Sequence, residues 1–244
     1  MDINCDLGEG ERLEKTRRLL RCVTSANIAC GGHAGSERSM RSCLRLCAEF
    51  KVNAGAHPGF PDRRHFGRSE MPISPWRLEL LLGHQTGALI RLAAEEKVPI
   101  THLKLHGALY HVVERDPRLS KVYARFVREN FSQMRIIGLP NGSVVCSAHS
   151  LGIDVWGEIF SDREYGPEGD LVPRNRPGAV IEDLALIRKR METFLLTGRL
   201  PLSNGRTRKI AARTICVHAD SPGSPRIARM LARLCVSAGR SGRT

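Results

Sequence analysis

Short apolar segments recur along the chain, and most of them are rich in β-branched residues or continuously hydrophobic. Strands that are buried on both faces of a parallel sheet have this composition. Between them lie stretches with apolar residues three or four positions apart, which is the pattern of an amphipathic helix. We therefore predict seven strands, over residues 1–5, 22–29, 52–56, 100–105, 134–139, 153–160 and 212–217.

The segments between the predicted strands carry helix start signals. Residues that can cap a helix N-terminus precede five of these segments, and three of the five are followed directly by proline: Ser36, Ser74, Asp116, Asp183 and Ser221. Alternating strands and helices predict a parallel sheet closed into a seven-stranded (β/α) barrel, with an open doubly wound sheet as the alternative. We expect one barrel domain over residues 1–236 and a frayed basic tail over 237–244.

Polar residues follow six of the predicted strands directly. In a parallel barrel all the C-terminal strand ends open on one face, so these residues would converge in one pocket. A single histidine after a strand is commonly structural, but the recurrence indicates a functional site. The candidates are Asn4, Asp6, Glu9, His33, His57, Lys104, His106, Asp162, Arg163, His218 and Asp220.

These residue types suggest hydrolysis. Histidine and aspartate can act as general bases or as metal ligands, and lysine or arginine can stabilise developing negative charge. We assign catalytic roles to Asp6, His33, His57, Lys104 and His106. The long Gly- and Pro-rich segment 162–177 adds Arg174, so the predicted substrate-binding residues are Asn4, Glu9, Asp162, Arg163, Arg174, His218 and Asp220.

Two points about this site stay open. A divalent metal ion is possible, but the residues alone do not identify one. Lys104 and His106 flank Leu105, so strand alternation directs both side chains to the same face, and we expect that face to be the barrel mouth. Lys104 would then hold an anionic group, unless it forms a structural ion pair with a strand-end carboxylate such as Asp6.

Composition narrows the function classes. The formal net charge is +13, but the basic residues are spread through the chain without interleaved aromatics, so we expect a solvated surface and no nucleic-acid partner. No segment is long and apolar enough for a membrane span, and the N-terminus does not resemble a secretory signal, so we expect a cytoplasmic protein. The eight cysteines form no CxxC pair and are expected to be reduced. No Walker-type phosphate loop, dinucleotide fingerprint or GxSxG motif is present.

The polar clusters closely resemble the LamB/YcsF family. The resemblance begins with NCDLGE at residues 4–9, continues with GAHPG at 55–59 and KLHGALY at 104–110, and ends with TICVH at 214–218. Further matching motifs lie at residues 24–31, 66–68, 162–165, 171–174 and 177–181. The match covers residues 1–236.

The resemblance implies a seven-stranded (β/α) barrel like that of the sugar-processing deacetylases and glycoside hydrolases. It also implies ATP-driven opening of 5-oxoproline to glutamate together with two partner subunits, which would bind most of the ATP. A metal-dependent deacetylase of carbohydrate-like substrates is the alternative. The chain departs from the family pattern at Gly32, Ser36, Leu105, Glu168 and Ala219. We expect a large residue at position 32, and Gly32 stands directly beside His33.

Overall fold

The seven predicted strands pair side by side in parallel and close into a barrel, in the order β1-β2-β3-β4-β5-β6-β9. This computed structural model describes residues 1–221 and 223–241. The strands are β1 (Asp2–Leu7), β2 (Ser25–Ala29), β3 (Asn53–His57), β4 (Ile100–Lys104), β5 (Arg135–Gly138), β6 (Val155–Phe160) and β9 (Thr214–Val217). Closure joins the first strand to the last, with Asp2 opposite Thr214. The predicted barrel is confirmed, and the open sheet is excluded.

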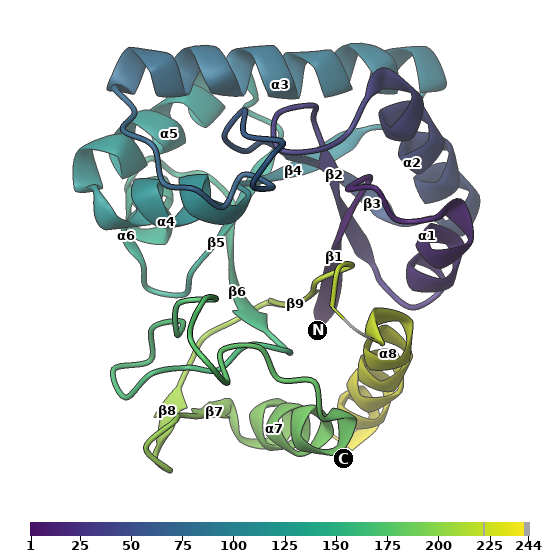
Figure 1. Cartoon of the computed structure of the whole chain (residues 1–244), viewed down its shortest axis with the longest axis vertical. Coiled ribbons are helices and arrows are strands. Elements are labelled where there is room, and N and C mark those ends of the chain that lie inside the picture. The colour runs from purple at the N-terminus through teal and green to yellow at the C-terminus, as the bar shows by residue number, and fades with distance from the viewer. Residues whose placement is uncertain (222, 242–244) are drawn as a thin grey trace.

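The helices form a ring around the strands (Figure 1). They are α1 (Leu13–Leu20), α2 (Glu37–Phe50), α3 (Pro75–Glu96), α4 (Gly107–Arg115), α5 (Pro117–Asn130), α6 (Ser143–Ser150), α7 (Leu184–Thr197) and α8 (Ser224–Ser241). The predicted caps at Ser36, Asp116 and Asp183 are confirmed, since each side chain accepts a hydrogen bond from a backbone N–H of its helix. Ser74 precedes α3 as predicted, but its side chain makes no such bond.

Two elements differ from the predicted pattern near the C-terminus. An antiparallel hairpin of β7 (Arg199–Pro201) and β8 (Thr207–Lys209), which was not predicted, lies between α7 and β9. The last helix begins at Ser224 rather than directly after Ser221, and Pro222 lies outside the described residues. This helix continues to Ser241, so residues 237–241 are helical where we expected a frayed tail. Residues 242–244 lie outside the described part of the chain.

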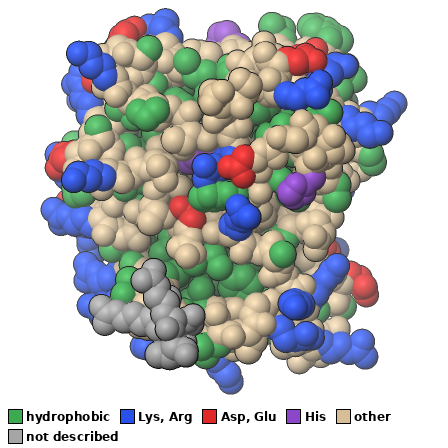
Figure 2. Space-filling model, turned by 180° about the vertical axis from the view of Figure 1, so that it is seen from behind, with side chains coloured by type: hydrophobic (Ala, Val, Ile, Leu, Met, Phe, Trp, Pro, Cys, Tyr) green, Lys and Arg blue, Asp and Glu red, His purple; other side chains and the backbone are tan. Residues whose placement is uncertain are grey.

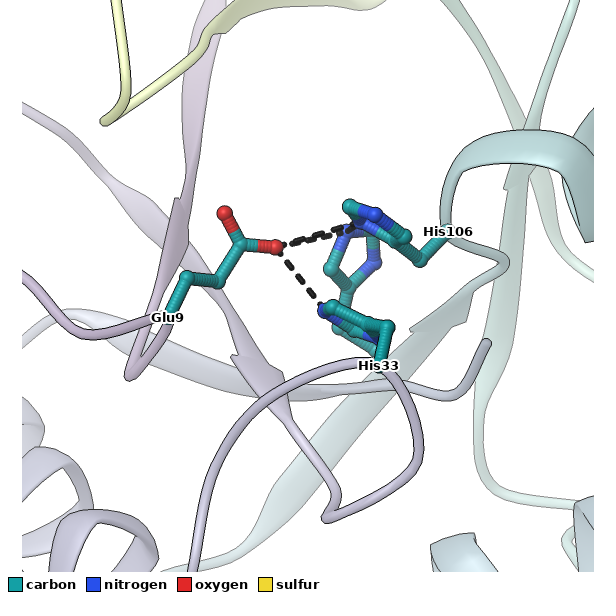
Figure 3. Close-up of side chains that lie close together, drawn as sticks. Glu9, His33 and His106 are labelled. Carbon is teal, nitrogen blue, oxygen red and sulfur yellow. Dashed lines mark hydrogen bonds and ion pairs between the residues drawn. The ribbon is translucent and has the colours of Figure 1, made fainter. Parts of the chain in front are cut away.

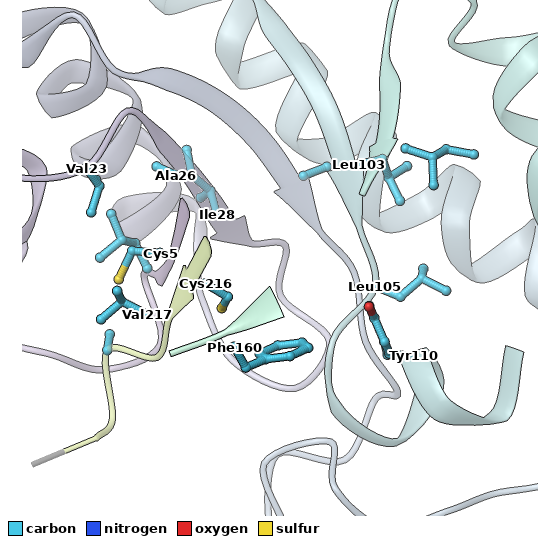
Figure 4. Packing of buried hydrophobic residues seen from close by; sticks show 14 of the residues in the cluster. Cys5, Val23, Ala26, Ile28, Leu103, Leu105, Tyr110, Phe160, Cys216 and Val217 are labelled. Atoms are coloured by element: carbon cyan, nitrogen blue, oxygen red, sulfur yellow. The ribbon is translucent and has the colours of Figure 1, made fainter. Parts of the chain in front are cut away.

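The apolar core fills the layer between the strands and the helices. On each strand alternate residues point outward, and these are hydrophobic, as Ile28 on β2 and Leu103 on β4 illustrate (Figure 4). Many inward positions carry polar residues, such as Asp6, Asn27 and Glu158, so the strands hold the functional groups while their outer faces anchor the helices.

The surface carries the positive charge in a dispersed form. On the face seen in Figure 2, Lys and Arg side chains are scattered among acidic and apolar ones and do not form a single stripe. None of the helices in residues 1–221 and 223–241 has the length and hydrophobicity needed to cross a membrane.

Candidate active site

The interior of the barrel is polar because the inward positions of neighbouring strands are polar. The Asn27 side-chain amide on β2 donates to Asn4 Oδ1 and to Asp6 Oδ1 on β1, at 2.8 Å in both cases. Lys104 reaches the same group from β4, with Nζ 3.1 Å from Asp6 Oδ1. The structure therefore brings together side chains that the sequence placed at three different strands.

Glu9 and three histidines form a second, buried cluster at the C-terminal strand ends (Figure 3). Glu9 Oε1 lies 3.0 Å from His33 Nε2, 3.1 Å from His106 Nδ1 and 3.8 Å from His57 Nε2. The rings of His33 and His106 stack with their centroids 3.6 Å apart. One donor atom from each of the four residues lies within 4.8 Å of the others, close enough to share a metal ion. Glu9, which we assigned to substrate binding, thus lies among three of the predicted catalytic residues.

Loop 58–74, which follows β3, holds this cluster in place and covers it. The backbone carbonyl of Phe66 accepts from His106 Nε2 at 2.9 Å. Gly67 has φ +64°, and a Cβ there would lie 2.6 Å from His33 Cβ, so only glycine lets the loop approach this closely. His57 closes β3 and donates from Nδ1 to the Lys104 carbonyl at 2.8 Å.

Burial and neighbouring charges set the protonation of these groups. Burial opposes ionisation of Asp6, but His57 and Lys104 outweigh it and hold the Asp6 pKa well below its usual range. Burial also disfavours a charged His57, but the Asp6 carboxylate outweighs it and raises the His57 pKa. Burial lowers the pKa of His33 to about 4, despite its hydrogen bond to Glu9. Asp6 is therefore a carboxylate and His33 is neutral at pH 7.

Lys104 is fully engaged with protein groups. Its Nζ lies 3.0 Å from Glu158 Oε2, 3.1 Å from Asp6 Oδ1, 3.2 Å from Asn4 Oδ1 and 3.1 Å from Cys216 Sγ. Burial disfavours its charge, but Asp6, Cys216 and Glu158 outweigh this and raise the pKa of Lys104. An ammonium group has three protons, so none is left for a substrate anion. The geometry favours the structural ion pair over the anion-holding role. Asn4 likewise directs its amide into this interior network.

A further polar group joins the ends of β6 and β9. Asp162 is fully buried and accepts hydrogen bonds from His218 Nδ1, at 2.9 Å, and from Ser221 Oγ. The His218 ring stacks on Phe160, with centroids 5.4 Å apart. A donor atom of His218 also lies within 4.8 Å of ligand atoms on Asp6 and Cys216, so this group adjoins the barrel interior.

The predicted arginines differ in what they contact. Arg163 is buried and donates to the carbonyls of Val172 and Ala179, at 2.7 and 3.2 Å, so these contacts brace its own loop rather than a substrate. Arg174 is partly exposed and pairs with Asp220 at 3.0 Å. Arg68, which we did not select, pairs with the same carboxylate.

Three interior residues escaped prediction: Asn27, His102 and Glu158. All three are buried, and each contacts the polar network directly or through its neighbour. They lie within strands rather than after them, which is why a search of strand ends missed them. Their signal is a polar residue at an inward position of an otherwise apolar strand, most clearly Glu158.

Comparison with known proteins identifies the family. The model of the LamB/YcsF family matches residues 1–243. The chain belongs to the LamB/YcsF family. It is 36% identical over 242 residues to the A subunit of 5-oxoprolinase from Pyrococcus horikoshii, covering 98% of this chain and 95% of that protein.

Solved structures share this fold, and one of them is also similar in sequence. A lactam utilization protein from Thermus thermophilus superposes with a TM-score of 0.89 at 33% identity, covering 98% of this chain and 97% of that one. A glycoside hydrolase family 20 module of the pneumococcal exo-β-D-N-acetylglucosaminidase StrH, with a TM-score of 0.52 and 7% identity, covers 97% of this chain and 83% of that one, and shares the fold alone.

The departure from the LamB/YcsF pattern at Gly32 has a structural explanation. A Cβ at Gly32 would lie 2.5 Å from Gln85 Nε2 and 2.6 Å from the Gly59 carbonyl oxygen. The buried Gln85 side chain fills this space and bonds Gly59 through both of its polar atoms. Gln85 of α3 therefore occupies the place where we expected a large residue at position 32.

Proposed function

We propose that this chain is the A component of an ATP-dependent 5-oxoprolinase, which opens the lactam of 5-oxoproline to give L-glutamate. The names of its LamB/YcsF relatives, together with the buried cluster of Glu9, Asp6 and three histidines at the strand ends, support this assignment. The similarity to these relatives is the observation that carries the lactam assignment, and the cluster supplies hydrolytic groups at the place where a barrel collects them.

Lactam hydrolysis requires a group that takes a proton from water and a group that protonates the leaving nitrogen. Asp6 is placed for the first role. Its Oδ1 is bound by Lys104 and Asn27, whereas Oδ2 faces the cluster, 3.5 Å from His57 Nε2. The Lys104 pair fixes the carboxylate, so Oδ2 is held in one direction.

ATP enters the proposal through partner subunits. Resonance stabilises the amide of a five-membered lactam, so phosphorylation of its oxygen would create a better leaving group. The sequence has no Walker-type phosphate loop that could bind the nucleotide. We therefore assign ATP binding mainly to two other subunits and completion of ring opening to this chain. The eight free thiols fit a reducing, ATP-containing compartment, the cytoplasm.

Substrate must reach a covered site. The side chains of Glu9, His33 and His57 are exposed by only 5%, 0% and 1%. Loop 58–74 bonds His106 through Phe66 and therefore has to move for a ligand to enter. Docking of a partner protein on this face would provide the means to coordinate entry with ATP cleavage.

The decisive experiment measures glutamate released from 5-oxoproline and ATP by this chain alone and with both partner subunits. We expect no turnover by the isolated chain and restoration by the partners. Asp6→Asn should lower the restored rate by ~10²–10⁴-fold, the usual range for a positioned base. Asp154→Asn, at the opposite end of the barrel, is the matched control and should not change it. Robust turnover by the pure chain would refute the division of labour, and a normal rate in Asp6→Asn would remove Asp6 from the mechanism.

The alternative, a metal-dependent deacetylase of carbohydrate-like substrates, draws on the same cluster of three histidines and a glutamate. Acetate release from acetylated amino sugars, without ATP or partners, would support it. Absence of that activity in metal-supplemented protein, together with partner-dependent glutamate release, would exclude it.

A further inference from the structure

The backbone fixes which nitrogen carries the proton in two of the clustered histidines. His57 Nδ1 lies 2.8 Å from the Lys104 carbonyl oxygen, and His106 Nε2 lies 2.9 Å from that of Phe66. A carbonyl oxygen can only accept, so each of these outer nitrogens must donate. In a neutral imidazole the other nitrogen then has a lone pair and no proton. When both rings are neutral, His57 Nε2 and His106 Nδ1 therefore face each other as acceptors at 3.0 Å.

The Glu9 carboxylate adds a third acceptor at the same point. Its Oε1 lies 3.1 Å from His106 Nδ1, 3.8 Å from His57 Nε2 and 3.0 Å from His33 Nε2. Figure 3 shows Glu9 pointing toward His33 and His106. The side chains are almost completely buried, so water does not screen these lone pairs from one another. His33 can donate its Nε2 proton to Glu9, but His57 Nε2, His106 Nδ1 and Glu9 Oε1 still need a proton or a metal ion between them.

We propose that Glu9 Oε1, His33 Nε2, His57 Nε2 and His106 Nδ1 bind one divalent transition-metal ion of the zinc type. Three imidazole nitrogens and one carboxylate oxygen form a donor set that such ions accept. Ligands bound at about 2.0–2.1 Å in a tetrahedron stand about 3.3 Å apart. The distances from Glu9 Oε1 to the three imidazole nitrogens, 3.0, 3.1 and 3.8 Å, bracket that value. Because the His33 and His106 rings stack in parallel, one of them has to tilt for both lone pairs to point at one ion.

The surroundings also fit a metal centre. Histidines that bind metals usually donate their outer N–H to a carbonyl or carboxylate, which orients the ring. His57 and His106 do this through the Lys104 and Phe66 carbonyls, whereas His33 Nδ1 is buried without a hydrogen-bond partner. A proton is the competing cation, because one imidazolium within the cluster would also separate the lone pairs. The experiment must therefore distinguish a metal ion from a proton.

The test uses the whole chain alone and needs neither lactam, ATP nor partners, so its outcome is independent of the proposed reaction. Protein stripped with a chelator is dialysed against Zn²⁺ or Co²⁺, bound metal is counted, and affinity is measured by competition with a chromophoric chelator. We expect one ion per chain and, with Co²⁺, the intense visible absorption of a four-coordinate site.

Variants locate the ion. Glu9→Gln and His33→Ala should each weaken binding by at least ~100-fold, more than loss of an outer hydrogen-bond partner usually does. His149→Ala, on the exposed face of α6, is the control and should bind like wild type. Circular dichroism checks each fold, and the Co²⁺ spectrum of the wild type serves as a readout if a variant fails to fold. Wild-type protein that binds no stoichiometric metal, or equal affinity in both cluster variants and wild type, would overturn the proposal and identify the shared cation as a proton.

Discussion

Single residues in the barrel interior carry large electrostatic consequences, and Lys104 is the clearest case. It lies between two buried carboxylates, Asp6 and Glu158. Lys104→Met should lower the free energy of unfolding by ~3–5 kcal/mol, because removing one partner leaves buried charge uncompensated. Urea unfolding measures this, with the exposed Lys121→Met as the control. A Lys104 variant of normal stability that has lost partner-dependent turnover would instead assign the lysine to substrate.

His102 gives a prediction about pH. Burial, followed by the charges of Arg135 and Lys104, lowers its pKa to about 3. A histidine with a depressed pKa stabilises the fold above its unfolded value of about 6.5, and this contribution disappears as pH falls toward the folded value.

Between pH 7 and pH 4 the wild type should therefore lose on the order of 3 kcal/mol through His102 alone. His102→Gln keeps a donor for Asn27 but binds no proton, so its loss of stability over this interval should be smaller by that amount. Urea unfolding at both pH values gives the difference. His149→Gln should behave like wild type, and equal losses in His102→Gln and wild type would contradict the assignment.

At the scale of elements, α3 packs so closely against the loop after β2 that Gly32 has no space for a side chain. Gly32→Ala should destabilise the protein by about 1–3 kcal/mol, because the new methyl group meets Gln85 and the Gly59 carbonyl. Gly87 of α3 is the matched control, since a Cβ there has nothing within 4 Å, and Gly87→Ala should stabilise by up to about 1 kcal/mol. Thermal unfolding compares the two, and a stabilising Gly32→Ala would show that α3 can shift.

Elements with strong local signals could be predicted from the sequence, and the others could not. The seven strands have continuous apolar composition, and the helices α2, α5 and α7 begin at side chains that cap them. The three helices that were missed, α1, α4 and α6, are only 8 or 9 residues long and have no side-chain cap. Tertiary packing rather than local sequence stabilises such short helices.

The site was predictable only in part for a similar reason. Asp6, His33, His57 and His106 follow the strands predicted from the sequence, so parallel topology alone predicts that they converge. The roles of Glu9, Lys104 and Arg163 depend on which partner each side chain reaches across the barrel or within its loop, and sequence spacing contains no information about that. The 3.1 Å contact between Lys104 and Asp6, which lie 98 residues apart, arises only from closure of the sheet.

For the whole molecule, the net charge of +13 should support only weak binding to DNA, because the basic residues are dispersed over the surface. We expect duplex DNA to bind no more tightly than a Kd of about 1 μM at 0.15 M salt, as in purely non-specific contacts. Fluorescence anisotropy over a salt series measures this. Sub-micromolar binding that survives physiological salt would point to a nucleic-acid partner instead.

Because the barrel closes through β1 and β9, its first and last strands, it cannot close until nearly the whole chain has been synthesised. The amide of Asn4 meets its Thr214 acceptor only after 210 further residues have been made. Until then one edge of β1 is unpaired, and the side chains of Asn4 and Asp6 are not yet enclosed in a barrel. Emergence of β9 from the ribosome thus completes the hydrogen bonding of the barrel interior, whereas Glu9, His33, His57 and His106 all lie in the first 106 residues and are made long before it.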